Sequence, residues 1–226
     1  MPSRIPKLFR PPLSDALKER FKNTYYPNSL TDKSFQPYVI AIGQTSLAWN
    51  ALQEALCELF SRVAKKEVER DFGIFLAIWH SLDSDRAQRK MFSTIARRIW
   101  EIGGIDDAMH KDIRWLLAEA DKLSDARNDV IHSPLVSRSN VVDPSNIKIQ
   151  VASRMHPRAK KLGMKDILPE MRRCRDTAII LRDYCLKMDG SLNFGAQEWP
   201  WPEKPRLLSR VGKSPQVSRH RKTPPK

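Results

Sequence analysis

Apolar residues recur at intervals of three, four and seven positions through most of this chain. That spacing follows the 3.6-residue period of an amphipathic helix. The predicted helices cover residues 36–66, a stretch from about residue 72, 86–100, 106–131 and 165–188. Only 8 glycines occur in 226 residues, which argues against collagen-like and turn-dense β architectures. The pattern predicts an all-α fold, a bundle of four or five helices.

Several local features predict where these helices end and which faces they bury. The stretch after Phe72 is apolar almost all round, so we expect it to be buried. In the 86–100 helix the expected buried stripe is Met91, Ile95 and Ile99. Gly103-Gly104 should end that helix, and Asp106-Asp107 should open the next one.

The stretch between residues 135 and 154 departs from the helical period. Residues 147–152 alternate apolar and polar side chains in the manner of a strand. Residues 135–142 can pair with them across a turn at 143–146, which reads Asp-Pro-Ser-Asn. We therefore expect a small β-hairpin inserted between two helices.

These elements predict three regions. Residues 1–32 form an N-terminal extension with a short helix that starts near Ser14. Residues 33–190 form the bundle with its hairpin insertion at about 135–154. Residues 191–226 hold a Trp-Pro segment and a basic tail. Trp199-Pro-Trp-Pro202 is expected to staple onto the bundle, and a ligand for a proline-reading partner domain is the alternative.

The net charge of +14 is concentrated at the ends of the chain. Residues 204–226 carry eight basic residues and no acidic one, whereas the body between residues 13 and 203 is nearly balanced. Such a tail cannot bury a core, so it is expected to be disordered. It either adds salt-dependent affinity for RNA or DNA or serves solubility alone.

The sequence lacks most of the patterns that would indicate secretion, a membrane segment or a bound metal. The start of the chain has no apolar signal segment, and no apolar run approaches the length of a bilayer span. Three scattered cysteines do not suggest a disulfide framework. The histidines are widely spaced, and His80 with Asp83 and Asp85 is the closest approach to a metal-ligand cluster. We expect a cytoplasmic protein without a membrane segment, metal or cofactor.

The stretch Ala126–Pro134 is the one candidate for chemistry. On a helical projection with Ile113 at zero, Arg127 falls at about −40°, inside the apolar stripe of the 106–131 helix. Asn128 lies near +60° and His132 near +100°, one turn apart on the flank of the stripe. A guanidinium aimed at an apolar face needs an anion or an acceptor network. A phosphate would satisfy it, and an adjacent imidazole suits proton transfer.

Structural roles also account for these residues. Arg127 could pair with an acid of another helix, and His132 could cap the end of its own helix. An arginine five positions before a histidine is weak evidence alone, because arginine is frequent in this chain.

Arg127-Asn128-x3-His132, late in a long helix of an α-bundle, resembles the Arg-(Asn/Asp/His)-x3-His signature of the HEPN superfamily. The likeness covers this motif and the helical layout of residues 36–190. It implies a HEPN-like bundle and a homodimer in which two copies of the motif face one cleft. It also implies a metal-independent endoribonuclease, with His132 as acid/base, Arg127 on the scissile phosphate and Asn128 positioning Arg127 or the substrate.

On this reading the chain cleaves RNA by 2′-OH attack to leave 2′,3′-cyclic phosphate ends. It would act as a toxin or defence effector, with an antitoxin or other protein as a further partner. One alternative is a non-catalytic helical dimerisation scaffold or regulatory module with a nucleic-acid-binding tail. Another is a bundle that binds a small nucleotide.

Overall fold

The computed structural model describes residues 33–66, 72–133, 135–140, 143–151, 162, 166–195 and 197–208. Its contacts divide the chain into two units. One unit holds Pro37–His132 and Ile167–Lys226, and the other holds Met1–Gln36 and Ser133–Asp166. The expected N-terminal helix near Ser14 lies outside the described residues, as does the chain beyond residue 208.

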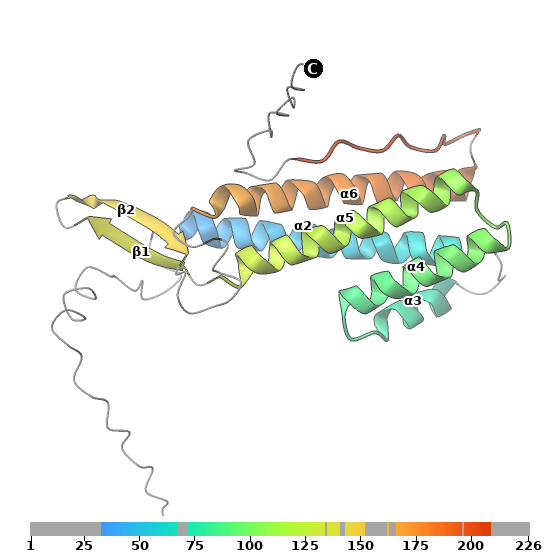
Figure 1. Ribbon diagram of the computed structural model, residues 1–226, viewed down its shortest axis with the longest axis horizontal. Helices are drawn as coiled ribbons and strands as arrows, with labels where there is room; N and C mark the ends of the chain where they lie inside the picture. Colours follow the sequence, from blue (N-terminus) through green and yellow to red (C-terminus); the bar gives the residue numbers. More distant parts are fainter. Residues whose placement is uncertain are drawn as a thin grey trace, which may run out of the picture. The chain divides into compact units, whose positions relative to one another are not determined.

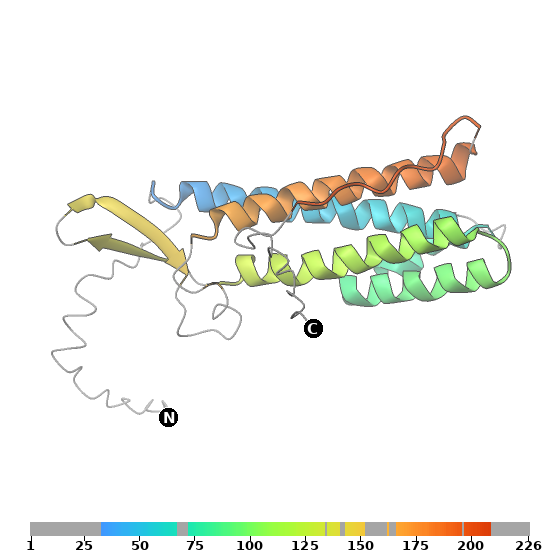
Figure 2. The ribbon, with the colours of Figure 1, turned by 45° about the horizontal axis from the view of Figure 1, so that its top comes forward.

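The first unit is helical, and its helices lie close to the predicted positions. They are α2 (Gln36–Ala64), α3 (Phe72–His80), α4 (Asp85–Glu101), α5 (Asp107–Ile131) and α6 (Leu168–Phe194). In Figures 1 and 2, α2, α5 and α6 run side by side, and α4 folds back along α5. The described part of this unit is an all-α bundle. The predicted boundary at residue 190 is wrong, because α6 continues to Phe194.

Apolar side chains from every helix form the core. Those with the least exposure include Leu52, Leu56, Phe60, Trp79, Phe92, Ile113, Leu116, Met171 and Leu181. Phe60 of α2 is the aromatic centre, because its ring contacts the rings of Phe75, Trp79 and Phe92. The expectation that α3 is buried all round is wrong in part. Ile74 and Ile78 are 42% and 43% exposed, since this short helix packs through one face only.

The buried face of α4 also differs from the prediction. Arg89, Phe92, Ala96 and Ile99 are buried, whereas Met91 and Ile95 are only half-buried. Arg89 has the spacing of a core position, three and seven residues before Phe92 and Ala96. Because Arg89 occupies a core position, the buried face of α4 is centred on Arg89, Phe92 and Ala96. The apolar residues alone had indicated a face that includes Met91 and Ile95.

The turn between α4 and α5 is fixed by caps at both ends. The Gly104 N–H donates to the Ile99 carbonyl at 2.9 Å and the Gly103 N–H to the Trp100 carbonyl at 3.0 Å. This paired arrangement needs a left-handed residue, which Gly103 supplies with φ of 81°. The Asp106 carboxylate then accepts the Met109 N–H at 2.8 Å and starts α5. Both predicted helix boundaries are confirmed here.

Residues 197–208, which we call the C-terminal strap, run back along α6 (Figures 1 and 2). The Trp199 ring packs on Gly190, where a Cβ atom would lie 3.0 Å from Trp199 Nε1. The Trp201 indole donates to Asp112 Oδ2 at 3.0 Å, and Lys204 pairs with Asp112 Oδ1 at 2.7 Å. The expected tryptophan staple is confirmed. The predicted disordered tail begins too early in the sequence. Its first residue, Lys204, is held against the bundle by its ion pair with Asp112 of α5.

The strap ends between α5 and α6. Leu207 and Leu208 line a hollow of about 210 Å³ together with residues that include Leu123 of α5 and Thr177 of α6. The last described residue of the chain therefore lies beside the middle of the bundle.

The second unit contains two antiparallel strands, β1 (Leu135–Asn140) and β2 (Asp143–Val151). Leu135 lies opposite Val151 in the register, and the pairing is irregular between Arg138 and Asn140. The predicted turn at residues 143–146 is wrong, since these residues belong to β2. A proline is tolerated there because each strand of a two-stranded ribbon has an edge without a ladder partner.

Candidate functional site

The Arg127–His132 motif occupies the last turn and the C-cap of α5. The helix ends at Ile131, and the His132 N–H donates to the Asn128 carbonyl at 3.1 Å. Ala126 and Val130 of the same turn are buried against the bundle. Their burial fixes the rotation of this turn and so the direction in which each motif side chain leaves the helix.

Arg127 projects from α5 onto Trp49 of α2. Its guanidinium carbon lies 5.3 Å from the centroid of the Trp49 ring, and Nη1 donates to Asn128 Oδ1 at 2.8 Å. The residue is half-buried, and its Nε is buried and has no hydrogen-bond partner in the part of the chain that the structure describes. Among the described residues, no carboxylate forms an ion pair with Arg127. A partly buried cation in this state attracts an anion, because its charge is stabilised only by a ring and an amide.

Sequence analysis missed a second arginine at the same ring. The guanidinium carbon of Arg89 lies 5.4 Å from the Trp49 centroid, and the Arg89 side chain is 1% exposed. Its Nε donates to Asp121 Oδ1 at 2.8 Å, and its Nη1 lies 3.6 Å from Asp85 Oδ2. Both Nη atoms are buried, and neither forms a hydrogen bond with a described residue. The signal in the sequence that could have identified Arg89 is its position, three and seven residues before the buried Phe92 and Ala96 of α4.

Asn128 connects the other two members of the motif. Its side-chain oxygen accepts from Arg127, and its backbone carbonyl accepts from His132. The His132 side chain itself is exposed. Arg127 and His132 are five residues apart, so they leave the helix about 140° apart around its axis. Within one copy of the chain, the described contacts therefore join Arg127 to Asn128 and leave the imidazole on a different side of α5.

The cysteines are unsuited to nucleophilic chemistry. Cys57, Cys174 and Cys185 are all buried, and none of them forms a disulfide bond with another described residue. Burial, aided by Glu54 and Glu58, raises the pKa of the Cys57 thiol to about 12. The pKa of Cys185 is also raised by burial, and its thiol donates to the Ala55 carbonyl at 3.1 Å. A thiol with a raised pKa holds little thiolate at neutral pH.

The described residues hold no group of three or more His, Cys, Asp or Glu side chains arranged to bind a metal ion. His80 with Asp83 and Asp85 is thus no such group. In the same part of the chain, every helix falls short of the length and apolar content of a membrane span.

No protein-family model matches this sequence, and no curated protein or solved structure matches the chain.

Proposed function

We propose that this chain is a metal-independent endoribonuclease of the HEPN type. Arg127 holds the scissile phosphate, His132 transfers the proton, and Asn128 keeps the Arg127 side chain in place. The supporting observation is the state of Arg127, which lies over Trp49 and donates to Asn128 without an ion pair among the described residues. A phosphate oxygen would complete its coordination, since arginine donates to phosphate through two parallel N–H groups.

The reaction proposed is an internal transesterification. The ribose 2′-oxygen attacks the adjacent phosphorus, so an O2′–P bond forms while the P–O5′ bond breaks. An imidazole takes the proton from the 2′-hydroxyl, and a proton is delivered to the departing 5′-oxygen. The products are a 2′,3′-cyclic phosphate and a 5′-hydroxyl. Arg127 stabilises the negative charge that grows on the phosphoryl oxygens.

The cleft is composite in this proposal. Arg127 and His132 of one copy leave α5 in directions about 140° apart, so one copy does not direct both at a single phosphate. Two copies that pair through this end of α5 can bring Arg127 of one copy to His132 of the partner subunit. RNA and a second copy of the chain are then the required partners, and an antitoxin-like protein that covers the cleft is a further one. As part of the same proposal, the chain acts as a toxin or defence effector.

The test is cleavage of total RNA in EDTA. Arg127→Met keeps the aliphatic stem over Trp49 and should lower cleavage by about 100-fold or more. His132→Ala should lower it by about 100-fold to 10,000-fold. His80→Ala on α3 and Arg172→Met on α6 change exposed residues of the same types and should cleave normally. Circular dichroism should show that all four variants are folded.

A mixing experiment separates a composite cleft from a site within one copy. Each of the two variants, Arg127→Met and His132→Ala, should cleave at about a hundredth of the native rate or less when it is assayed alone. In a mixed dimer, a composite arrangement regenerates one cleft with both native residues, so activity should return on mixing. No recovery after subunit exchange would contradict the composite cleft. If native protein and variants are equally inert on varied RNAs, the enzyme proposal fails and a non-catalytic helical scaffold remains.

A further inference from the structure

A basic groove lies between α4 and α5, away from the Arg127 motif's own turn. Its volume is about 500 Å³, and its charged lining is Arg86, Arg89, Lys90, Arg114 and Asp121. A second hollow of about 310 Å³ shares Ser93, Thr94 and Arg114 with it and adds Arg97 and His110. Because the two hollows share these residues, they form one continuous groove, and Asp121 is the single carboxylate among the cations of its described lining.

The cations of this groove are incompletely neutralised. Arg86 pairs with Asp125 and Arg97 with Glu101, but all four side chains are well exposed, so these pairs stabilise little. Lys90 and Arg114 form no ion pair with any described residue. Beneath them the 1%-exposed Arg89 keeps both Nη atoms without a hydrogen bond. The groove therefore combines an exposed positive rim with a buried cation in its wall.

The shape and chemistry of the groove fit a chain of phosphates. From Arg86 to Arg97 the wall of α4 is about 16 Å long at 1.5 Å per residue, which exceeds a single phosphate group. Among the described residues, its lining has guanidinium, ammonium and hydroxyl donors but no aromatic ring other than the His110 imidazole. Such a surface offers donors to phosphate oxygens and lacks the aromatic platforms on which bases stack, so phosphate contacts, which carry no sequence information, should dominate binding.

The groove leads toward the motif. The Arg86 end of α4 is joined to α5 through Asp125, at 3.1 Å and two residues before Arg127. Arg89 in the groove wall and Arg127 in the motif also contact the same Trp49 ring. A strand in the groove thus approaches the Arg127 end of α5.

We infer that the α4–α5 groove binds the phosphodiester backbone of single-stranded RNA and directs the strand to the Arg127 site. The direction of the strand rests on the proposed function, whereas backbone binding by Lys90 and Arg114 does not.

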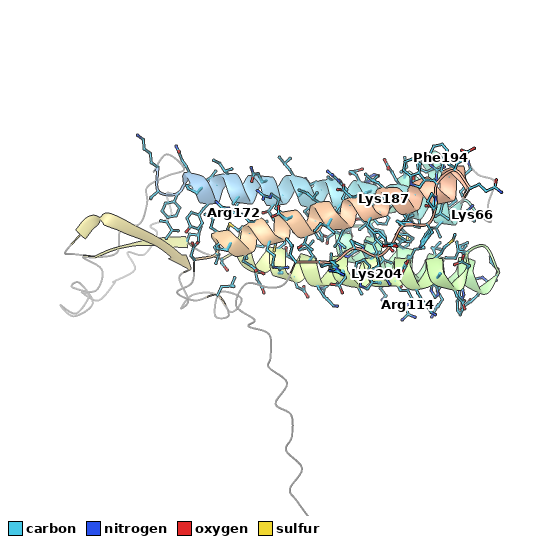
Figure 3. All side chains as sticks on the ribbon, turned by 90° about the horizontal axis from the view of Figure 1, so that it is seen from above. Lys66, Arg114, Arg172, Lys187, Phe194 and Lys204 are labelled. Atoms are coloured by element: carbon cyan, nitrogen blue, oxygen red, sulfur yellow. The ribbon has the colours of Figure 1, made fainter. Side chains whose placement is uncertain are left out.

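The experiment measures binding of a labelled single-stranded RNA of about twelve nucleotides to the full-length His132→Ala protein. Affinity is determined by fluorescence anisotropy at several potassium chloride concentrations. The groove variant is Lys90→Gln/Arg114→Gln. The matched control, Arg172→Gln/Lys187→Gln, removes two charges from exposed positions of α6 (Figure 3 labels these two residues and Arg114). Each lost phosphate contact lowers the slope of log affinity against log salt by about 0.7 for a single strand.

We expect the groove variant to bind at least tenfold more weakly at low salt, with a slope smaller by about 1.4, and the control to bind as before. Equal losses in both variants would reduce the effect to net charge and overturn the inference. It is also overturned if adenosine 5′-monophosphate binds as tightly as the RNA, since the groove would then be a small-nucleotide site. If the groove variant loses binding and the native protein does not cleave RNA, the result supports RNA binding in the groove and contradicts only the proposed nuclease activity.

Discussion

Replacing Asp112 with asparagine tests how the C-terminal strap is held to the bundle. The Asp112 carboxylate accepts from the Tyr184 hydroxyl at 2.9 Å and from the Trp201 indole at 3.0 Å, and it pairs with Lys204 at 2.7 Å. Its side chain is 16% exposed. Asparagine has nearly the same shape but only one acceptor oxygen and no charge. The substitution therefore removes the negative charge at this position with little change in packing.

The size of the effect follows from these contacts. Hydrogen bonds to a charged group contribute about 1.5–3 kcal/mol each, against about 1 kcal/mol for neutral ones. The pair with Lys204, whose side chain is 42% exposed, adds about 1 kcal/mol at most. Asparagine can still accept from Tyr184 and Trp201, so the free energy of unfolding should fall by about 2 kcal/mol at pH 7. For a domain of this size that is a loss of about 4–8 °C in Tm.

The pH dependence gives the sign of the effect. Burial alone would raise the pKa of Asp112, but hydrogen bonds from Lys204, Trp201 and Tyr184 outweigh it and hold the pKa below its ordinary value. A carboxyl with a depressed pKa in the folded state contributes its stability above the pKa of the unfolded chain, about 3.9. That contribution is lost as pH falls through the lower folded pKa. The gap between native protein and Asp112→Asn should therefore close below about pH 4.

Urea denaturation followed by tryptophan fluorescence, at pH 7, 5 and 3, measures this gap. Asp183→Asn is the matched control, because Asp183 is an exposed carboxylate whose one ion pair within the described residues is with neighbouring Arg182. It should change stability by less than about 0.5 kcal/mol. A gap that is the same at every pH, or an Asp112→Asn protein as stable as the control, would refute the reasoning.

Two further substitutions test buried polar groups. Arg89→Met should change stability by less than about 1 kcal/mol, because it removes two unsatisfied Nη atoms but also the ion pair with Asp121, whose carboxylate is 52% exposed and stays hydrated. Arg89→Ala should lower it by about 2–4 kcal/mol through the cavity, and equal losses in both variants, measured by urea denaturation, would contradict this account. His110 is 7% exposed and stacked on Trp100, and burial followed by the charge of Arg114 lowers its pKa. The native protein should lose stability as pH falls below about 6.5, because the unfolded chain then binds the proton more readily. Thermal melts of His110→Phe between pH 7 and 5 should show a flatter profile, and an unchanged profile would assign the dependence to other groups.

The sequence predicted the helices well because their apolar residues keep one period over many turns. Prediction failed where burial depends on distant partners. Arg89 is buried because it donates a hydrogen bond to Asp121 of α5 and lies over the Trp49 ring of α2. Both partners are distant in the sequence, so no local pattern indicates that they contact Arg89. The turn expected at residues 143–146 failed for a related reason, since turn-forming residues also fit an unpaired strand edge.

The candidate site was predicted in part. The helical projection placed Arg127 at the packed face of its helix, and the half-buried guanidinium over Trp49 agrees with that placement. The same projection could not identify the ring beneath it or the second arginine on that ring. It also could not show that the Asn128 side chain receives a hydrogen bond from Arg127, because two rotamers decide that contact.

The route of the strap has a consequence for the residues that follow it. At Leu207 and Leu208 the chain lies beside Leu123, one helical turn before Arg127. Residues 209–226, with most of the basic charge beyond the bundle, are therefore covalently tethered next to the motif and not at the far end of α6. An anion bound at Arg127 would therefore lie near the point at which this basic segment joins the bundle. Lengthening the chain just after Leu208 would dilute that charge without altering a single contact of the bundle.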